Sequence, residues 1–280
     1  MKAATNLLIL FLLGRVTKSK LQSGSYVRQA YGVGQELKEK NNYPGSGTLY
    51  LLDKNYKDIL SSTESLGGER PTKLNAASLT GIWAENNTRV SLFVVLKRKE
   101  CFGTSGNRIK VHLFAGWDYK ENLIRQTDWV DKSNSTGVPM EGNLTPFENQ
   151  KKTKFIVQAI KDPHAGNLDC IQIIKDSTKN GKRTEQEFNT VWSGNRKKSS
   201  IGKIPSVENT VDIKTATYDN SIGSSNLIGY WEDVNFDPEE YVTYYERVIE
   251  IPAPRWSTYL ATKYNMEVSK TVSATIQERA

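Results

Sequence analysis

The chain alternates apolar and polar residues over several long stretches, which is the spacing expected of β-strands. Strand-length apolar runs bounded by polar residues lie at 79–83, 90–96, 109–117 and 155–160. Towards the C-terminus the alternation continues through 241–251, 256–262 and 266–276. A strand that buries one face repeats every two residues, whereas a helix repeats about every 3.6 residues. The sequence therefore predicts a mainly β fold, an elongated protein of antiparallel β-sheets.

One hairpin is marked by its turn. Asn180-Gly181 lies between two extended segments, and Asn-Gly is the strongest short hairpin signal because both central residues of a type I′ turn need positive φ. The strand predicted after this turn is amphipathic, since its odd positions are mostly polar. Its half-apolar face includes the even positions Thr184, Phe188, Thr190 and Trp192.

The organisation of the chain indicates a leader followed by two domains. We expect a signal peptide over residues 1–19, a β-rich recognition domain over 20–150 and a second β module over 151–280. The polar stretch at 131–150 contains two prolines and is predicted to be a long surface loop. The strand pattern becomes most regular after this stretch, which is why the boundary is placed there.

The first residues have the layout of a secretory signal. Lys2 precedes an apolar run at 7–13, and Thr17-Lys18-Ser19 has the small-x-small pattern of a cleavage site. A run of seven apolar residues is too short to span a bilayer, so cleavage near Lys20 is favoured over an uncleaved anchor. Loss of Lys2, Arg15 and Lys18 lowers the formal net charge from +7 to +4. We expect a secreted, extracellular protein whose mild positive charge favours an anionic membrane surface.

Secretion gives a meaning to the cysteines and the glycosylation sequons. Two cysteines in an oxidising compartment most simply form one disulfide, here Cys101–Cys170, and two buried thiols are the alternative. Asn86, Asn134 and Asn143 each begin an N-x-[ST] sequon and are predicted to be glycosylated. All three lie before residue 150, which predicts exposed loops in that half of the chain.

The sequence lacks the motifs of the common enzyme and cofactor sites. Its two histidines, His112 and His164, are far apart in sequence, and there is no zinc-protease motif, nucleophile elbow, phosphate-binding loop or dinucleotide fingerprint. We therefore expect a protein that is not an enzyme, with no metal site and no cofactor. A secreted chain without a basic stripe interleaved with aromatic residues also does not fit nucleic-acid binding.

A resemblance to a known family appears in the second half of the chain. A Ser/Thr-containing segment at 187–207 is followed by the residues Thr-Val-Asp-Ile-Lys-Thr-Ala-Thr-Tyr at 210–218, and then by Val-Ile-Glu-Ile-Pro-Ala-Pro at 248–254. Two alternating segments then end in Thr-Val-Ser-Ala-Thr-Ile at 271–276. In this order, the segments resemble the pore-forming module of the aerolysin superfamily, including epsilon-toxin-like and natterin-like proteins.

The resemblance implies a mechanism and a set of membrane-inserting residues. Such proteins bind a cell-surface glycan, protein or lipid, assemble into a ring, and insert one hairpin per subunit into a closed transmembrane barrel, which satisfies every backbone hydrogen bond. The corresponding hairpin would span 182–207 and turn near Gly194-Asn195. The residues facing the membrane would be Thr184, Phe188, Thr190, Trp192, Ile201 and Ile204. The alternative is a plain surface hairpin, because Arg196, Lys197, Lys198 and Lys203 leave neither face of the second arm apolar.

Two non-lytic functions compete with pore formation. Gly81-Ile-Trp83 looks like the opening strand of a calycin, a barrel whose pocket Trp117 and Trp129 would line. The other alternative is a lectin-like adhesive module. In such a module Tyr230-Trp231 would lie in a loop, and the aromatic rings would stack on sugars. Membrane permeabilisation distinguishes the pore former from both of these secreted ligand-binding proteins.

Overall fold

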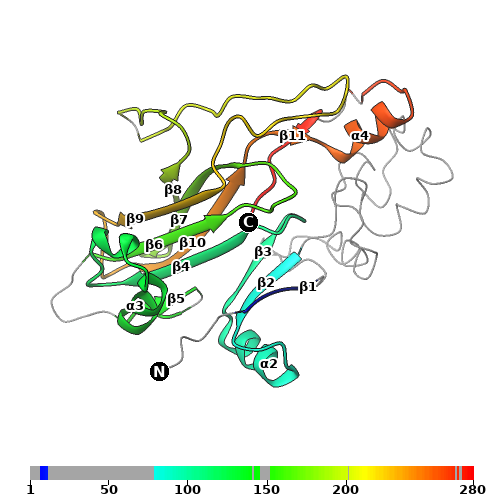
Figure 1. Ribbon diagram of the computed structural model, residues 1–280. Helices are drawn as coiled ribbons and strands as arrows, with labels where there is room; N and C mark the ends of the chain where they lie inside the picture. Colours follow the sequence, from blue (N-terminus) through cyan, green and yellow to red (C-terminus); the bar gives the residue numbers. More distant parts are fainter. Residues whose placement is uncertain are drawn as a thin grey trace.

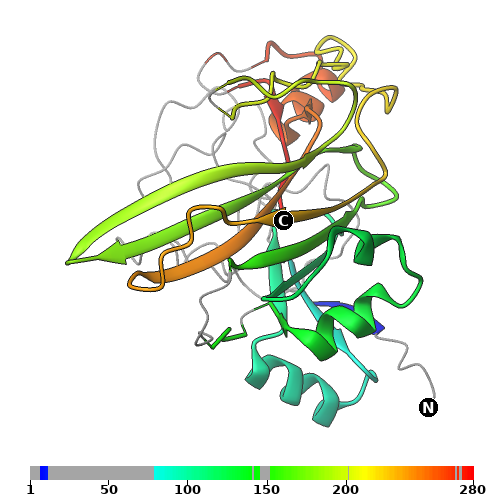
Figure 2. The ribbon, with the colours of Figure 1, turned by 90° about the vertical axis from the view of Figure 1, so that its left-hand side faces the viewer.

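The computed structural model describes residues 7–11, 79–140, 142–145, 152–200, 202–268, 270 and 273–280. The described part of the chain is mainly β, built from several antiparallel sheets with a few short helices (Figure 1). This confirms the predicted fold class. The long β7–β8 hairpin extends beyond the other strands when the molecule is turned by 90° (Figure 2).

Two sheets make up most of the fold. The first, ordered β5-β4-β6-β9, consists of β4 (Lys110–Gly116), β5 (Val138–Pro139), β6 (Lys154–Ile160) and β9 (Asn226–Glu232). The second, ordered β10-β7-β8, consists of β7 (Leu168–Lys179), β8 (Lys182–Trp192) and β10 (Tyr241–Glu250).

The remaining elements are short. A third sheet, ordered β1-β2-β3, consists of β1 (Leu7–Phe11), β2 (Leu79–Ala84) and β3 (Cys101–Thr104), and a two-stranded ribbon pairs β11 (Ala253–Pro254) with β12 (Thr275–Ile276). The helices are α2 (Arg89–Arg98), the 3-10 helix η4 (Glu121–Arg125), α3 (Trp129–Thr136) and α4 (Trp256–Lys263).

The main core lies between the two larger sheets. It contains Ile109, Val111, Phe155, Val157, Ala159, Leu168, Ile171, Ile173, Leu227 and Val248. On β4, Val111 faces this core, whereas Phe114 belongs to a second apolar cluster with Tyr119, Leu123 and Ile156. Because successive strand residues point to opposite faces, β4 contributes to a packed layer on each side of its sheet. The elements η4 and α3 cover the outer face, where Tyr119 Oη donates to the Ser133 carbonyl at 2.5 Å.

The predicted turn of the β7–β8 hairpin is confirmed. Asn180 and Gly181 have φ of 52° and 76°, as a type I′ turn requires. The two strands pair in register from Lys179–Lys182 to Cys170–Trp192, with one irregularity between Ile171 and Gln172. This register was fixed locally by the turn sequence.

A buried ion pair joins the two large sheets. Lys175, at the centre of the β10-β7-β8 sheet, places its Nζ 2.8 Å from Asp233 Oδ2, just after β9 of the other sheet. The two side chains are 2% and 1% exposed. Tyr244 Oη donates to the same carboxylate at 2.6 Å, and burial together with Asp233 raises the pKa of Tyr244. The Asn235 carbonyl accepts a second hydrogen bond from Lys175. Every partner is thereby satisfied, which a buried charge requires.

Several predicted strands are helices in the structure. The run 90–96 lies within α2, because the Thr88 side chain caps the helix by accepting from Ser91 N and Lys99 ends it with φ of 64°. The segment 256–262 lies within α4, whose Trp256 and Leu260 pack together one turn apart. Both runs are apolar on more than one side, so the pattern of apolar residues did not distinguish a strand from a helix.

Other predictions also fail for tertiary reasons. The expected loop at 131–150 begins in α3, and of the expected strand at 266–276 the described residues form only β12. The boundary at 150/151 falls within one sheet, since β4 pairs with β6 over seven residue pairs. In the described part of the chain it therefore does not separate two folding units.

The apolar run expected in the signal peptide contributes a strand. Leu7–Phe11 forms β1 and pairs antiparallel with β2. Cleavage near Lys20 would remove β1 and leave β2 paired with β3 alone.

Replacing Lys175 with Met is expected to destabilise the protein strongly. The substitution leaves Asp233 buried without its cation, and removing one partner of a buried pair costs about 3–5 kcal/mol. Lys179→Met is the matched control, because Lys179 lies on the same strand and pairs with Asp237 at 2.5 Å but is 39% exposed. Urea unfolding measures both free energies. Equal, small effects of the two substitutions would show that the buried pair does not hold the sheets together.

Stability is also expected to fall as pH rises, because of Glu246 on β10. Both carboxylate oxygens of Glu246 are enclosed and have no hydrogen-bond partner among the described residues. Burial raises the pKa of Glu246 well above the ordinary 4.5, so the folded state holds a proton that the unfolded state releases. The free energy of unfolding therefore decreases from about pH 4.5 upward. Glu246→Gln should match the wild type at pH 4.5 and exceed it at pH 8 in urea unfolding. A constant difference across this range would contradict the assignment.

Candidate functional site

The most unusual surface of the described chain is the exposed side of α2. Leu92 and Val95 pack this helix against Ile82 and Ala84. Four other large apolar side chains of the helix face solvent: Val90 is 73% exposed, Phe93 65% and Val94 38% on the opposite side, and Leu96 is 40% exposed beside Leu92. We call these four residues the α2 apolar surface. Soluble proteins rarely gather large apolar residues on one exposed helix, and such patches mark interaction sites.

Basic residues lie at both ends of α2. Val90, Phe93 and Val94 have the i, i+3, i+4 spacing of one helical face, and Lys97 continues that line one turn further. Arg89 begins the helix, and Lys97, Arg98 and Lys99 lie at its end. Arg98 pairs with Glu100 at 2.8 Å. In both views α2 lies at one extremity of the drawn elements (Figures 1 and 2).

Sequence reasoning missed this surface because it predicted a strand over the same residues. The signal that would have found it is the Thr88 cap followed by apolar residues at helical spacing. A helix apolar on both sides is normally buried, so the finding depends on which side the rest of the fold covers.

The residues expected to insert into a membrane do not form one hairpin. Thr184, Phe188, Thr190 and Trp192 lie on β8, which is the second arm of the β7–β8 hairpin and pairs with β7. Phe188 packs on Trp231 with ring centroids 4.9 Å apart, and Thr190 Oγ1 donates to the Ile171 carbonyl. Ile204 lies in an irregular segment after β8, and Ile201 lies outside the described residues.

The predicted second arm of the membrane-inserting hairpin is held against the fold by hydrogen bonds and is irregular where it is described. Gly194 turns with φ of 70°, and Arg196 Nη2 lies 2.5 Å from Asp169 Oδ1. The same guanidinium also donates to the Ser193 and Pro205 carbonyls. A guanidinium held by several acceptors fixes the chain beside β7, and the described residues 193–200 and 202–207 do not form a β-arm.

The two cysteines do not form the predicted disulfide. Cys101 begins β3 and packs against the small α2 cluster, whereas Cys170 is buried on β7. The two residues therefore belong to different sheets. Burial raises the pKa of the Cys170 thiol to about 12, which makes it a protonated, unreactive core side chain.

The predicted glycosylation sites are accessible. Asn86, Asn134 and Asn143 are all exposed, as an N-linked glycan requires. Asn86 lies just before α2, and Asn134 lies on α3. Their modification stays a prediction.

The aromatic residues of the two non-lytic alternatives are divided among three places. Trp83 on β2 stacks on His112, and Trp129 lies edge-on to the same ring. Trp117 contacts Phe236 elsewhere. Trp231 is not in a loop but on β9, where it packs against the main core.

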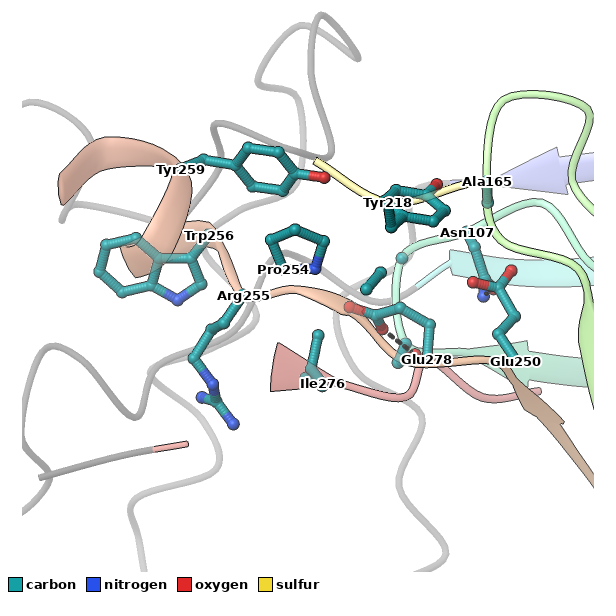
Figure 3. Close-up of a pocket in the computed structure, with 13 residues that line it drawn as sticks. Asn107, Ala165, Tyr218, Glu250, Pro254, Arg255, Trp256, Tyr259, Ile276 and Glu278 are labelled. Atoms are coloured by element: carbon teal, nitrogen blue, oxygen red, sulfur yellow. Dashed lines mark hydrogen bonds between the residues drawn. The ribbon is translucent and has the colours of Figure 1, made fainter. Parts of the chain in front are cut away.

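A small polar cleft lies where β10, α4 and the C-terminal residues meet (Figure 3). Asn107 Nδ2 donates to Glu250 Oε1 at 2.9 Å, and the two side chains are 2% and 1% exposed. Tyr218 and Tyr259 line another side, and burial raises the pKa of Tyr218 to about 12. The cavity measures about 40 Å³, enough for roughly three water molecules. Its size and hydrogen bonding fit a structural junction between the β3–β4 loop and β10.

The described ranges contain neither a cluster of metal-ligating side chains nor a helix suited to crossing a membrane. No group of three or more His, Cys, Asp or Glu side chains there is arranged to hold a metal ion. None of the helices in those ranges combines the length and the apolar character needed to cross a bilayer.

Comparison with known proteins gives one match. The family model described as "Protein of unknown function (DUF3604)" matches residues 32–280. No curated protein and no solved structure matches the chain. Because the family model covers nearly the whole chain, this protein belongs to the DUF3604 family.

Proposed function

We propose that this protein binds the surface of anionic membranes through the α2 apolar surface. The observation that carries the proposal is the set of four exposed apolar side chains on one ten-residue helix, bordered by basic residues. A helix with this distribution lies in the plane of the membrane interface, with its apolar side among the acyl chains and its charges among the headgroups.

The apolar residues provide the first contribution. Phe93 and Val90 lie on the same side of the helix and are the two most exposed members of the surface. Fully burying one such side chain is worth about 1.5–3 kcal/mol. The helix is already folded and capped against the protein, so membrane binding does not have to order it.

The charges provide the second contribution. Arg89, Lys97 and Lys99 are exposed at the two ends of α2. Each basic residue close to an anionic lipid surface contributes about 1 kcal/mol, and salt weakens this term. Together the two contributions favour an anionic lipid surface over a neutral apolar partner.

Ring assembly and membrane insertion, which the aerolysin resemblance implies, stay predictions. The segment that follows β8 would have to release Arg196 from Asp169 before it could form a second arm. Of the two long strands that the resemblance implies after Pro254, the described residues form α4 and the short β12. Surface binding requires neither rearrangement.

Replacing Phe93 with Ser is expected to weaken vesicle binding about tenfold, because it removes the largest apolar side chain of the surface. Co-sedimentation with vesicles of phosphatidylcholine plus phosphatidylserine measures the partition, using protein made without glycosylation because Asn86 adjoins the helix. Tyr241→Ser is the matched control, since Tyr241 is an 86% exposed aromatic residue on β10. Equal vesicle binding by the two variants would contradict the proposal.

Charge substitution tests the electrostatic part separately. Arg89→Gln combined with Lys97→Gln should reduce binding to these anionic vesicles and make the residual binding less dependent on salt. Dye-loaded vesicles in the same experiment report whether insertion follows binding. Binding that is lost in the charge variant but retained by Phe93→Ser would show that charge alone attracts the protein to the vesicles, and would contradict burial of the α2 apolar surface in the membrane.

A further inference from the structure

A second surface feature, distinct from the α2 apolar surface, lies between α2 and α3. It is a cavity of about 260 Å³ whose aromatic wall includes Trp83, His112 and Phe114. We call it the aromatic cleft. The Trp83 and His112 rings stack with centroids 3.9 Å apart and planes 17° apart. His112 and Phe114 are nearly parallel at 5.9 Å, so the three rings form a continuous stack.

The stack is held rigidly by the fold. His112 and Phe114 are alternate residues of β4, so both face away from the main core. Trp83 Nε1 donates to the Val111 carbonyl at 2.8 Å, which fixes the indole over β4. Trp129 of α3 meets His112 edge-on at 5.8 Å. The aromatic wall is therefore formed before any ligand arrives, which lowers the entropy cost of binding.

The charges around the aromatic cleft are mostly negative. Glu85, Glu100 and Asp131 line it, and Arg98 is the one cationic lining residue, which pairs with Glu100 at 2.8 Å. Burial lowers the pKa of His112 to about 4, so this ring is neutral near pH 7. Three carboxylates against one guanidinium leave a net charge of −2. Within the described part of the chain, neither Glu85 nor Asp131 has an ion-pair partner.

We propose that the aromatic cleft binds a small organic ammonium cation, such as a trimethylammonium group. Aromatic faces attract cations through their ring quadrupole, and quaternary ammonium groups are recognised in this way. Glu85 and Asp131 supply the negative charge that balances the cation, and no existing ion pair has to break for them to do so. The volume lies below the roughly 300–1,000 Å³ of pockets for drug-sized ligands, so the ligand is small.

A neutral sugar fits the same cleft less well. Sugar recognition needs donors as well as acceptors for the ring hydroxyls, and the Trp83 indole N–H is already used by Val111. Asn134 adds one amide group that can donate, but Glu85 and Asp131 only accept hydrogen bonds when ionised. A cation satisfies the aromatic wall and the carboxylates together.

Isothermal titration with choline chloride and with 3,3-dimethyl-1-butanol tests the charge requirement. The two compounds have nearly the same shape, and only choline is charged. Choline is expected to bind at least about tenfold more tightly. The protein is made without glycosylation, because Asn134 lines the cleft. Equal binding of both compounds, or binding of methyl glycosides without choline, would overturn the proposal.

Two matched variants locate the site. Asp131→Asn is expected to weaken choline binding about fivefold, because it removes one counter-charge and changes little of the fold. Asp128→Asn is the control, since Asp128 is also exposed on the same helix end but pairs with Lys132 and does not line the cleft. Thermal unfolding checks that both variants fold. Identical choline binding by the two variants would contradict the assignment.

The same cation occurs free and as a lipid headgroup, and vesicles distinguish the two sources. If phosphatidylcholine is the ligand, free choline will displace the protein from phosphatidylcholine vesicles. If the free cation is the ligand, titration will show binding and the vesicles will not compete. Phe93→Ser should keep choline binding in either case, so this proposal and membrane binding through α2 can fail independently. Absence of choline binding by the wild type would refute the cleft proposal whatever the vesicles show.

Discussion

The buried pair between Lys175 and Asp233 is the interaction on which the arrangement of the two large sheets depends. It joins the central strand of one sheet to the end of the edge strand of the other, with Tyr244 closing the network. An ammonium and a carboxylate this deeply buried are tolerated only when each satisfies the other. The pair therefore specifies one relative position of the sheets, whereas the apolar contacts between them would accept neighbouring positions.

The fixed arrangement of the two large sheets positions both candidate functional surfaces. Val111 of β4 belongs to the core while His112 and Phe114, on either side of Leu113, face the opposite layer. The same strand thus anchors the core and supports the aromatic cleft. Burial of Leu92 and Val95 of α2 leaves Phe93 and its neighbours in solvent. The α2 apolar surface and the aromatic cleft share one end of the fold, since Arg98 at the end of α2 also lines the cleft.

The two proposals describe different chemistry on neighbouring surfaces. An exposed apolar helix bordered by basic residues fits an anionic lipid interface, and an aromatic cleft with unpaired carboxylates fits a small cation. Both place recognition in the part of the chain before residue 150. The β7–β8 hairpin, by contrast, has Phe188 and Thr190 engaged with the fold. The membrane binding proposed for α2 therefore does not need this hairpin to change its fold.

The sequence alone determined the features whose cause is local. Asn180-Gly181 specified its turn because few other residues accept positive φ, and the apolar alternation of β4, β6 and β10 predicted strands that do form. Tertiary structure decided whether 90–96 and 256–262 became strands or helices, because apolar runs without one clear period fit either backbone. It also decided that Cys101 and Cys170 lie in different sheets, and that Trp83, His112 and Asp131 share a cleft. Contacts between residues distant in sequence follow from how the elements pack, and no local pattern encodes them.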